Sequence, residues 1–348
     1  MVTTRDKRRE RWNTIMDMII SAFRNTGKPV SSSYVAAHCN LDLCPATIRN
    51  VMKELEDEGY LSQPHTSAGR IPTVKGYRYY VDYLMPTPDL PEYQAEHIKT
   101  LIEQAIREND ADVFLDHIAQ MLSEVTDLVG VAMTPFLNRC VFERLDIVSL
   151  GGTRYLLVIS LKNGLVRTIN LTLDHVVARA KIGETARFLS NRLGGLTIGE
   201  IKRTIGDRIK NISGGDRLLI DVILDHREQI FTAADEGDIH VSGISRLLGL
   251  PEFSDVTVSH KLIGLSENKL RISDLFRQRF ADRGGFTIDI GDSELLGVSV
   301  PLSIVAATWF SGGTPGIVGV IGPTRIDYSR VMAVIKHTAS VTTTFFSS

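Results

Sequence analysis

The sequence predicts a multidomain α+β protein in which a small helical domain precedes a larger α/β domain. Three observations support this prediction. The chain of 348 residues, 43% hydrophobic and 23% charged, exceeds the ~100–200 residues of a typical domain. Pro86, Pro88 and Pro91 interrupt any regular element and indicate a linker. Helical spacing before the linker gives way to a mixture of strand-like and helical runs after it. The expected domains are residues 1–85, a linker at 86–92, an α/β domain at 93–174 and 251–348, and a helical insertion at 175–250.

Charge is unevenly distributed along the chain. Residues 1–81 hold 12 Lys and Arg against 8 Asp and Glu, a net of +4, although the whole chain has a net charge of −2. Such asymmetry is a modest indication of contact with nucleic acid, because a basic segment is attracted to phosphates.

Other composition features exclude several classes of protein. The longest weakly interrupted apolar run, Leu295 to Phe310, contains serine, proline and threonine and is too short for a membrane span. The charged N-terminus does not resemble a secretory signal. Cys39, Cys44 and Cys140 have no paired spacing, which disfavours disulfides and zinc sites. We therefore expect a cytoplasmic protein without metal, cofactor or membrane contact.

Three helices are expected before the linker. Apolar residues recur at three- and four-residue intervals from Trp12 to Phe23, which predicts a first helix that ends near Gly27. Ser31 to Ser33 offer caps for a short second helix. Pro45 begins a third helix, which Gly59 ends.

The third helix and the segment after it predict a winged helix-turn-helix. Ile48, Val51, Met52 and Leu55 occupy one face, so polar side chains capable of bonding bases and phosphates face outward. A short strand at 60–63, a polar loop at 64–69 and a return from Arg70 form a hairpin. An ordinary solvated helix surface is the alternative interpretation. The expected DNA-contacting residues are Thr47, Arg49, Asn50 and Lys53 on the helix, His65, Ser67 and Arg70 in the hairpin loop, and Arg78 as a phosphate contact.

The segment beyond the linker alternates between helical and strand-like patterns. Strands, a block of helices and strands again indicate a helical insertion within one α/β domain. The expected helices are 93–109, 113–130, 175–193, 198–212, 216–231, 241–248 and 328–339, and the expected strands are 141–150, 155–161, 165–171, 286–290, 295–310 and 317–321.

The helical block also supplies a candidate dimer surface. Two half-sites of a palindrome require two copies of a helix-turn-helix. Leu218, Leu219, Val222 and Ile223 form an apolar stripe that one sheet need not bury. The alternative is that this stripe packs only within the monomer.

Several blocks of the sequence resemble one family. Pro64 to Met85, PHTSAGRIPTVKGYRYYVDYLM, is similar to the signature of the HrcA family of bacterial heat-inducible transcription repressors. Pro45 to Met52, PATIRNVM, resembles its recognition helix. Gly319 to Arg330, GVIGPTRIDYSR, resembles its C-terminal motif, and Gly249 to Phe253, GLPEF, resembles a family turn. Two positions depart from the pattern: Cys44 replaces a serine cap, and Gly291–Glu294 replaces a more acidic segment.

The resemblance implies a homodimeric repressor that binds an inverted-repeat operator upstream of chaperone genes. It further implies a GAF-like central domain, an inserted dimerisation domain, dependence on the bacterial chaperonin and release from DNA on heating. The protein would lie in the cytoplasm and on the nucleoid when bound.

Two other classes of function remain as alternatives. An enzyme is not expected, because no phosphate-binding loop, nucleophile elbow or zinc-protease helix is present. A ligand-sensing one-component regulator with a pocket in the GAF-like domain is the main alternative, although no convergent polar set marks such a pocket. A scaffold without DNA binding would leave the basic first quarter unexplained.

Overall fold

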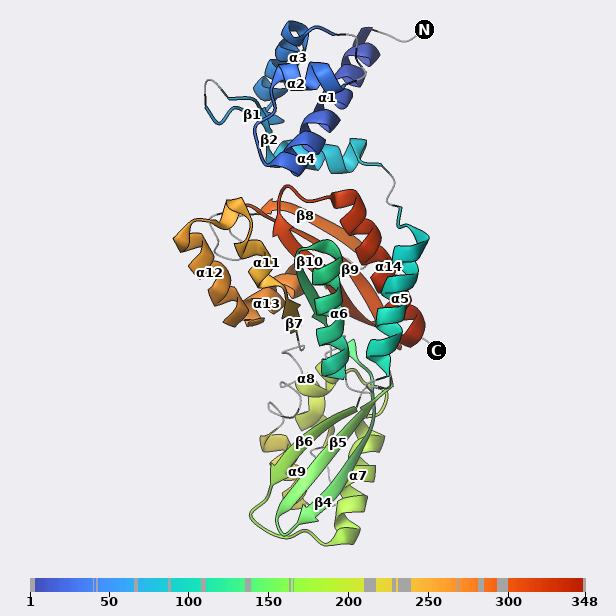
Figure 1. Cartoon of the computed structure of the whole chain (residues 1–348). Coiled ribbons are helices and arrows are strands. Elements are labelled where there is room, and N and C mark those ends of the chain that lie inside the picture. Colours follow the sequence, from blue (N-terminus) through green and yellow to red (C-terminus); the bar gives the residue numbers. More distant parts are fainter. Residues whose placement is uncertain are drawn as a thin grey trace.

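The computed structural model shows three units that follow one another along an elongated molecule (Figure 1). It describes residues 4–39, 41, 43–65, 68–86, 89–107, 111–134, 139–162, 164, 166–209, 217–226, 230, 239–267, 269–280, 285–292 and 300–346. We call the units the N-terminal unit (within 4–85), the α/β unit (within 89–134 and 239–346) and the inserted unit (within 139–230).

The N-terminal unit contains the three helices and the hairpin that the sequence predicts. Ser31 caps the second helix, since its side chain accepts a hydrogen bond from the Tyr34 amide at 3.2 Å. Pro45 is the first residue of the third. The hairpin strands are antiparallel, with Leu61 opposite Pro72. The elements are α1 (Thr4–Thr26), α2 (Ser32–His38), α3 (Pro45–Asp57), β1 (Leu61–Ser62), β2 (Ile71–Pro72), α4 (Val74–Tyr79) and a π-helical turn at Tyr80–Leu84.

The α/β unit is built on an antiparallel sheet with strand order β7-β3-β10-β9-β8. Helices α5, α6 and α14 cover one face, and α11, α12 and α13 cover the other, so the sheet has a hydrophobic core on each side (Figure 1). The helices are α5 (Glu92–Ile106), α6 (Ala111–Thr126), α11 (Ile244–Leu248), α12 (Val256–Glu267), α13 (Lys269–Phe280) and α14 (Tyr328–Phe346), with a 3-10 turn at Pro251–Phe253. The strands are β3 (Val129–Met133), β7 (Ile239–Ser242), β8 (Phe286–Asp292), β9 (Leu302–Ser311) and β10 (Thr314–Pro323).

The inserted unit has its own sheet and its own core. Strands β4, β5 and β6 form an antiparallel sheet, and α7, α8 and α9 pack on one of its faces (Figure 1). Thr197 and Glu200 form a capping box that begins α8. The elements are β4 (Phe142–Gly151), β5 (Arg154–Leu161), β6 (Val166–Thr172), α7 (Arg179–Leu193), α8 (Ile198–Arg208) and α9 (Arg217–Asp225).

Two expected helices are wrong in part because each contains a strand. The helix expected at 113–130 ends at Thr126, and Val129–Met133 forms strand β3. The helix expected at 241–248 is divided into strand β7 and the short helix α11. Strand β3 is buried at every residue, so it lacks the alternation that distinguishes a strand from a buried helix.

The expected helical insertion at 175–250 is also wrong. The three strands at 142–172, assigned to the α/β domain in the expectation for 93–174, form a sheet of their own among the described residues and share a core with α7–α9. Residues 239–248 return instead to the five-stranded sheet, because β7 pairs with β3. The order of the strands along the chain does not reveal which strands pair. Both boundaries of the expected insertion, 175 and 250, were therefore wrong.

The expectations for 251–348 are partly confirmed. Strands β8 and β10 lie where strands are expected, and the last helix continues to Phe346. Strand β9 begins at Leu302, within the strand expected at 295–310, of which residues 295–299 lie outside the described residues. Helices α12 and α13, between 251 and 285, were not predicted from the sequence. None of the described helices combines the length and the hydropathy that crossing a bilayer requires.

Gly130 lets α6 lie directly against the sheet. A Cβ atom added there would lie 1.9 Å from the carbonyl oxygen of Ala119. We expect Gly130→Ala to lower the free energy of unfolding by about 1–3 kcal/mol, since the helix must shift to make room. Thermal denaturation followed by circular dichroism measures the change. Gly183→Ala in α7 is the matched control, because no atom lies within 4 Å of its added Cβ, and it should leave stability equal or slightly higher. Equal stability of both variants would contradict the close approach.

Candidate functional site

The outer face of α3 presents a group of polar side chains to solvent. Arg49, Asn50 and Lys53 are exposed. On the opposite face Ile48 and Leu55 are at most 2% exposed and anchor the helix in the hydrophobic core of the unit. The prediction, made from the amphipathic spacing, that these three side chains point to solvent is therefore confirmed.

Thr47 lies at the beginning of α3, and its hydroxyl is hydrogen-bonded to a neighbouring side chain. Its hydroxyl lies 3.2 Å from the Sγ atom of Cys44, the residue that precedes the helix. This hydrogen bond lowers the pKa of the exposed Cys44 thiol. Thr47 is half-buried, so it offers less surface to a ligand than Arg49 does.

The hairpin is fastened to the helices at its base. Arg70 forms an ion pair with Glu56 of α3 at 2.9 Å, and its main chain exchanges hydrogen bonds with Val30. Gln63 donates a side-chain hydrogen bond to the Ala68 carbonyl across the loop at 2.9 Å. His65 is exposed near the tip, whereas Ser67 lies outside the described residues.

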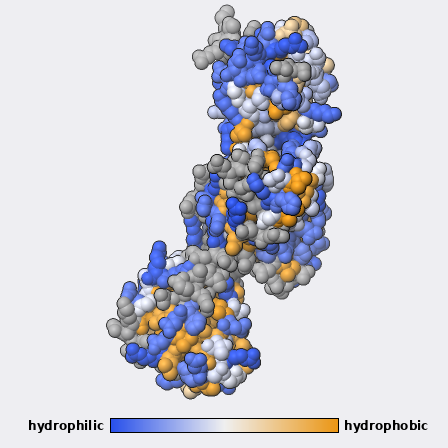
Figure 2. All heavy atoms as spheres, turned by 90° about the vertical axis from the view of Figure 1, so that its left-hand side faces the viewer, coloured by the Kyte–Doolittle hydropathy of each residue, from blue (hydrophilic) through white to orange (hydrophobic). Residues whose placement is uncertain are grey.

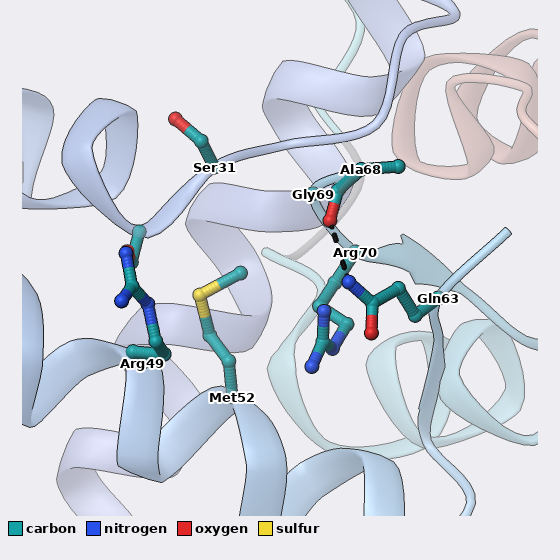
Figure 3. Close-up of a pocket in the computed structure, with 8 residues that line it drawn as sticks. Ser31, Arg49, Met52, Gln63, Ala68, Gly69 and Arg70 are labelled. Atoms are coloured by element: carbon teal, nitrogen blue, oxygen red, sulfur yellow. Dashed lines mark hydrogen bonds between the residues drawn. The ribbon is translucent and has the colours of Figure 1, made fainter. Parts of the chain in front are cut away.

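A hollow of about 410 Å³ separates α3 from the hairpin. Figure 3 shows Arg49 and Arg70 on opposite sides of this hollow, with Met52 between them. Two guanidinium groups on one concave surface make it suitable for an anion, because arginine donates to phosphate oxygens in a bidentate manner. The lining residues are Ser31, Ser32, Arg49, Met52, Gln63, Ala68, Gly69 and Arg70.

Three of the polar lining residues, Ser31, Ser32 and Gln63, were not among the predicted contacts. The sequence indicates Ser31 and Ser32 only as helix caps and Gln63 only as a strand residue. Their proximity to Arg49 depends on the packing of α2 and the hairpin against α3, which spacing does not encode.

Arg78 lies away from this surface. Its Nη1 atom donates to the carbonyl oxygen of Ile288 at 3.1 Å, and its Nη2 atom lies 3.8 Å from Asp289. Both partners belong to strand β8 of the α/β unit. The guanidinium is thus engaged between two units, and we do not retain it as a proposed phosphate contact.

Comparison with known proteins identifies the family. The family model described as "HrcA protein C terminal domain" matches residues 112–332. A relative from Chlorobium chlorochromatii (strain CaD3), described as heat-inducible transcription repressor HrcA, is 36% identical over 327 residues, which cover 93% of each chain. A second with that description, from Prosthecochloris aestuarii, is 35% identical over 346 residues, which cover 96% of each chain. The chain belongs to the HrcA family of heat-inducible transcription repressors.

A solved structure shares the fold of this chain. A crystal structure described as that of a hypothetical protein aligns over 97% of the HrcA-family chain and 96% of its own, with a TM-score of 0.52 and 22% identity. The likeness shows a shared fold.

The expected dimer stripe of this HrcA-family chain is largely internal. Leu219 and Ile223 are buried in the core of the inserted unit, and Val222 is half-buried against that core. Only Leu218, 59% exposed, points to solvent. The stripe therefore packs within the monomer, as the alternative interpretation held, because β4–β6 supply the surface that α9 covers.

The opposite face of the β4–β6 sheet carries apolar side chains that the described helices leave uncovered. Val148 of β4 lies opposite Leu156 of β5, and Val158 follows two residues later on the same face. Val148 is 46% exposed and Val166 of β6 is 59% exposed. Figure 2 shows hydrophobic residues among hydrophilic ones on the side of this lowest unit that faces the viewer there. We call Val148, Leu156, Val158 and Val166 the open sheet face.

Two hollows in the described part of the α/β unit bear on the ligand-sensor alternative. A hollow of about 330 Å³ between α5 and α6 is lined by polar residues that include His117 and Gln120 and leaves this alternative open, whereas the second hollow is too small for a metabolite. This second hollow, lined by Val129, Leu247 and Leu302, has a volume of about 10 Å³, roughly the minimum for one water molecule. Its lining is apolar, without the polar groups that orient a metabolite. Among the described residues, moreover, no three potential metal ligands lie together.

Proposed function

We propose that the protein is a sequence-specific DNA-binding repressor of heat-shock chaperone genes that binds an inverted-repeat operator as a dimer. The observation that carries this proposal is the exposed Arg49, Asn50 and Lys53 face of α3, beside a hollow that Arg70 also lines. Membership of a repressor family supports the same conclusion. The protein would act in the cytoplasm, on the nucleoid.

The proposed mode of binding is that of a winged helix-turn-helix. Helix α3 would enter the major groove, where the Asn50 amide can pair with adenine and the Arg49 guanidinium with guanine. The β1–β2 hairpin would follow the adjacent backbone, with His65 at its tip. Arg70, whose guanidinium is paired with Glu56 at 2.9 Å, would contribute a phosphate contact through the hollow only by sharing its donors between that carboxylate and the phosphate.

A mobility-shift titration tests this proposal. Purified protein is mixed with DNA from the chaperone promoter of its own cell and with a scrambled duplex of equal length, at two salt concentrations. We expect tight, specific binding that weakens as salt rises, because phosphate contacts release counterions. Equal affinity for both duplexes, or none for either, would contradict the proposal.

Substitutions on α3 separate base contacts from phosphate contacts. Arg49→Ala should cost about 1–3 kcal/mol for the operator and little for scrambled DNA. Lys53→Ala should weaken both and reduce the slope of log affinity against log salt by about one. Lys99→Ala on α5 removes an equal charge from a surface outside the N-terminal unit and is the matched control. If Arg49→Ala binds the operator as the unchanged protein does, α3 is not the reading element.

The open sheet face supports the dimer. The exposed apolar side chains of this face alternate with polar ones, among them the Arg144–Asp146 ion pair. Such side chains are stabilised when a second copy covers them, and a symmetric pair of such faces gives a closed dimer. This surface replaces the α9 stripe in our proposal. The face of the sheet that α7–α9 cover is then part of the hydrophobic core of the monomer.

We further infer that heating releases DNA through loss of the folded dimer, and that the bacterial chaperonin restores it. A net charge of −2 gives little protection against association once strands are exposed. The test heats protein with operator, with and without chaperonin and nucleotide, while binding and light scattering are followed. Binding lost reversibly without a change in oligomeric state, or recovery indifferent to chaperonin, would refute this mechanism.

A further inference from the structure

Three of the sequence blocks that carry the family resemblance meet at one place outside the DNA-facing surface. They are the segment from Val74 to Arg78, the GLPEF turn at Gly249–Phe253 and the GPTRIDYSR segment that ends at Arg330. They come together where the N-terminal unit contacts the α/β unit (Figure 1). The operator contacts proposed above make no use of them.

On the α1 side of this contact, charged groups form a connected set. Arg24 near the end of α1 pairs with Asp327 at 2.9 Å, with exposed fractions of 30% and 38%. Arg325 forms an ion pair with Glu252 and also donates to the Arg24 main-chain carbonyl at 3.3 Å. One arginine therefore bonds both to the GLPEF turn and to the end of α1.

On the α4 side, a second set of charges fastens the same two units. Arg78 donates to the Ile288 carbonyl and lies within ion-pair distance of Asp289. Asp289 is also paired with Arg279 of α13, so its carboxylate is held in place from within the α/β unit. This anchor is on strand β8, whereas the first is at the beginning of α14.

Aromatic and backbone packing closes the contact. Tyr77 and Tyr328 are each 1% exposed, with ring centroids 6.0 Å apart. The Tyr328 hydroxyl lies 2.7 Å from Ser303 and donates to the Thr324 carbonyl, which fixes its ring. Val74 lies so close to Gly291 that a Cβ added there would be 2.2 Å from Val74 Cγ2. The two units thus meet through a buried tyrosine pair that partly exposed polar anchors flank.

We propose that Arg24 and Arg78 are positioning residues that hold the α3 reading face at a fixed orientation relative to the dimerising body, and thereby set the half-site spacing that the operator must have. The inference rests on the proposed function. Two anchors on α1 and α4, with a buried tyrosine pair in the same contact, oppose both rotation and tilt of the N-terminal unit. A unit attached only by the proline-rich linker would reach half-sites over a range of spacings.

The test measures affinity for operators whose half-sites are moved apart or together in single base-pair steps. The variant is Arg24→Gln with Arg78→Gln in the full chain; Asp327 is left unchanged because it caps α14 through the Arg330 amide. Arg8→Gln, which breaks an ion pair inside the N-terminal unit, is the control on the same helix. The unchanged protein and the control should bind operators of one spacing more tightly than the others. In the double variant, the ratio of affinities for the favoured spacing and for the other spacings should fall by at least about fivefold. Its affinity for an isolated half-site should not change.

Each other outcome has a definite meaning. A double variant that keeps the spacing preference, or loses affinity for the isolated half-site, overturns the positioning role. Tight binding by the unchanged protein at every spacing overturns it too and leaves the proposed function standing. Failure to bind any operator removes both.

A measurement without DNA provides a second readout. Hydrogen exchange at the α4 amides of Val74–Tyr79 should be faster in the double variant than in Arg8→Gln. Equal exchange would show that the anchors do not hold the units together, and would overturn the inference.

Discussion

Replacing Val148 with aspartate should convert the dimer into a monomer and lower operator affinity by about a hundredfold or more. In the proposed dimer this side chain is covered by the partner's sheet, where an unpaired carboxylate costs several kcal/mol. A monomer then binds each half-site separately and loses the gain in effective concentration that joins the two binding events. Sedimentation and operator titration measure the two effects.

The control for this change is Val256→Asp. Val256 is 71% exposed at the beginning of α12 in the α/β unit, where a carboxylate suits the helix terminus. The Val256→Asp variant should remain dimeric and bind the operator with unchanged affinity. Val148 is 46% exposed in the single chain, so circular dichroism should show both variants folded. A dimeric Val148→Asp with normal affinity would exclude the open sheet face as the interface.

Truncating Ile48 to alanine should lower the free energy of unfolding by about 2–5 kcal/mol. Ile48 is 0% exposed, and the cluster that buries it continues through Tyr77 and Tyr328 to Val331 of the α/β unit. Because this core is continuous, we expect the two units to unfold in one transition at a lower temperature. Calorimetry and hydrogen exchange measure it.

The conservative variant Ile48→Val serves as the comparison and should cost about 0.5–1.5 kcal/mol. Both variants should shift the same single transition, in proportion to the volume removed. A separate low-temperature transition of the N-terminal unit, with the α/β unit unaffected, would show that the shared core does not couple them.

Helix α3, the proposed reading element, was predictable because its signals are local. Pro45 fixes its beginning, Gly59 with φ of +79° follows its end, and the spacing of Ile48, Met52 and Leu55 determines which side faces solvent. Each of these signals depends on residues at most a few positions apart, which a single sequence displays directly.

Long-range contacts were not predictable in the same way. The partner of Arg78 is Ile288, 210 residues further along the chain, so the exposed arginine of a basic segment proved to be a connection between units. The open sheet face was missed for a related reason. Leu156 and Val158 alternate with buried residues, but only the observed register places Val148 beside them.

Strands β3 and β7 are antiparallel neighbours, so the inserted unit takes the place of the turn that would join them in a β-hairpin. Met133 lies directly opposite Ile239, so the chain leaves the five-stranded sheet and re-enters it at adjacent points. Because closing a longer loop adds free energy only in proportion to the logarithm of its length, so large an excursion costs only about 3 kcal/mol more than a short turn. A turn of a few residues would join the same two strands. The inserted unit, our proposed dimerisation unit, could therefore be exchanged at this one point of the chain without a change in the five-stranded sheet.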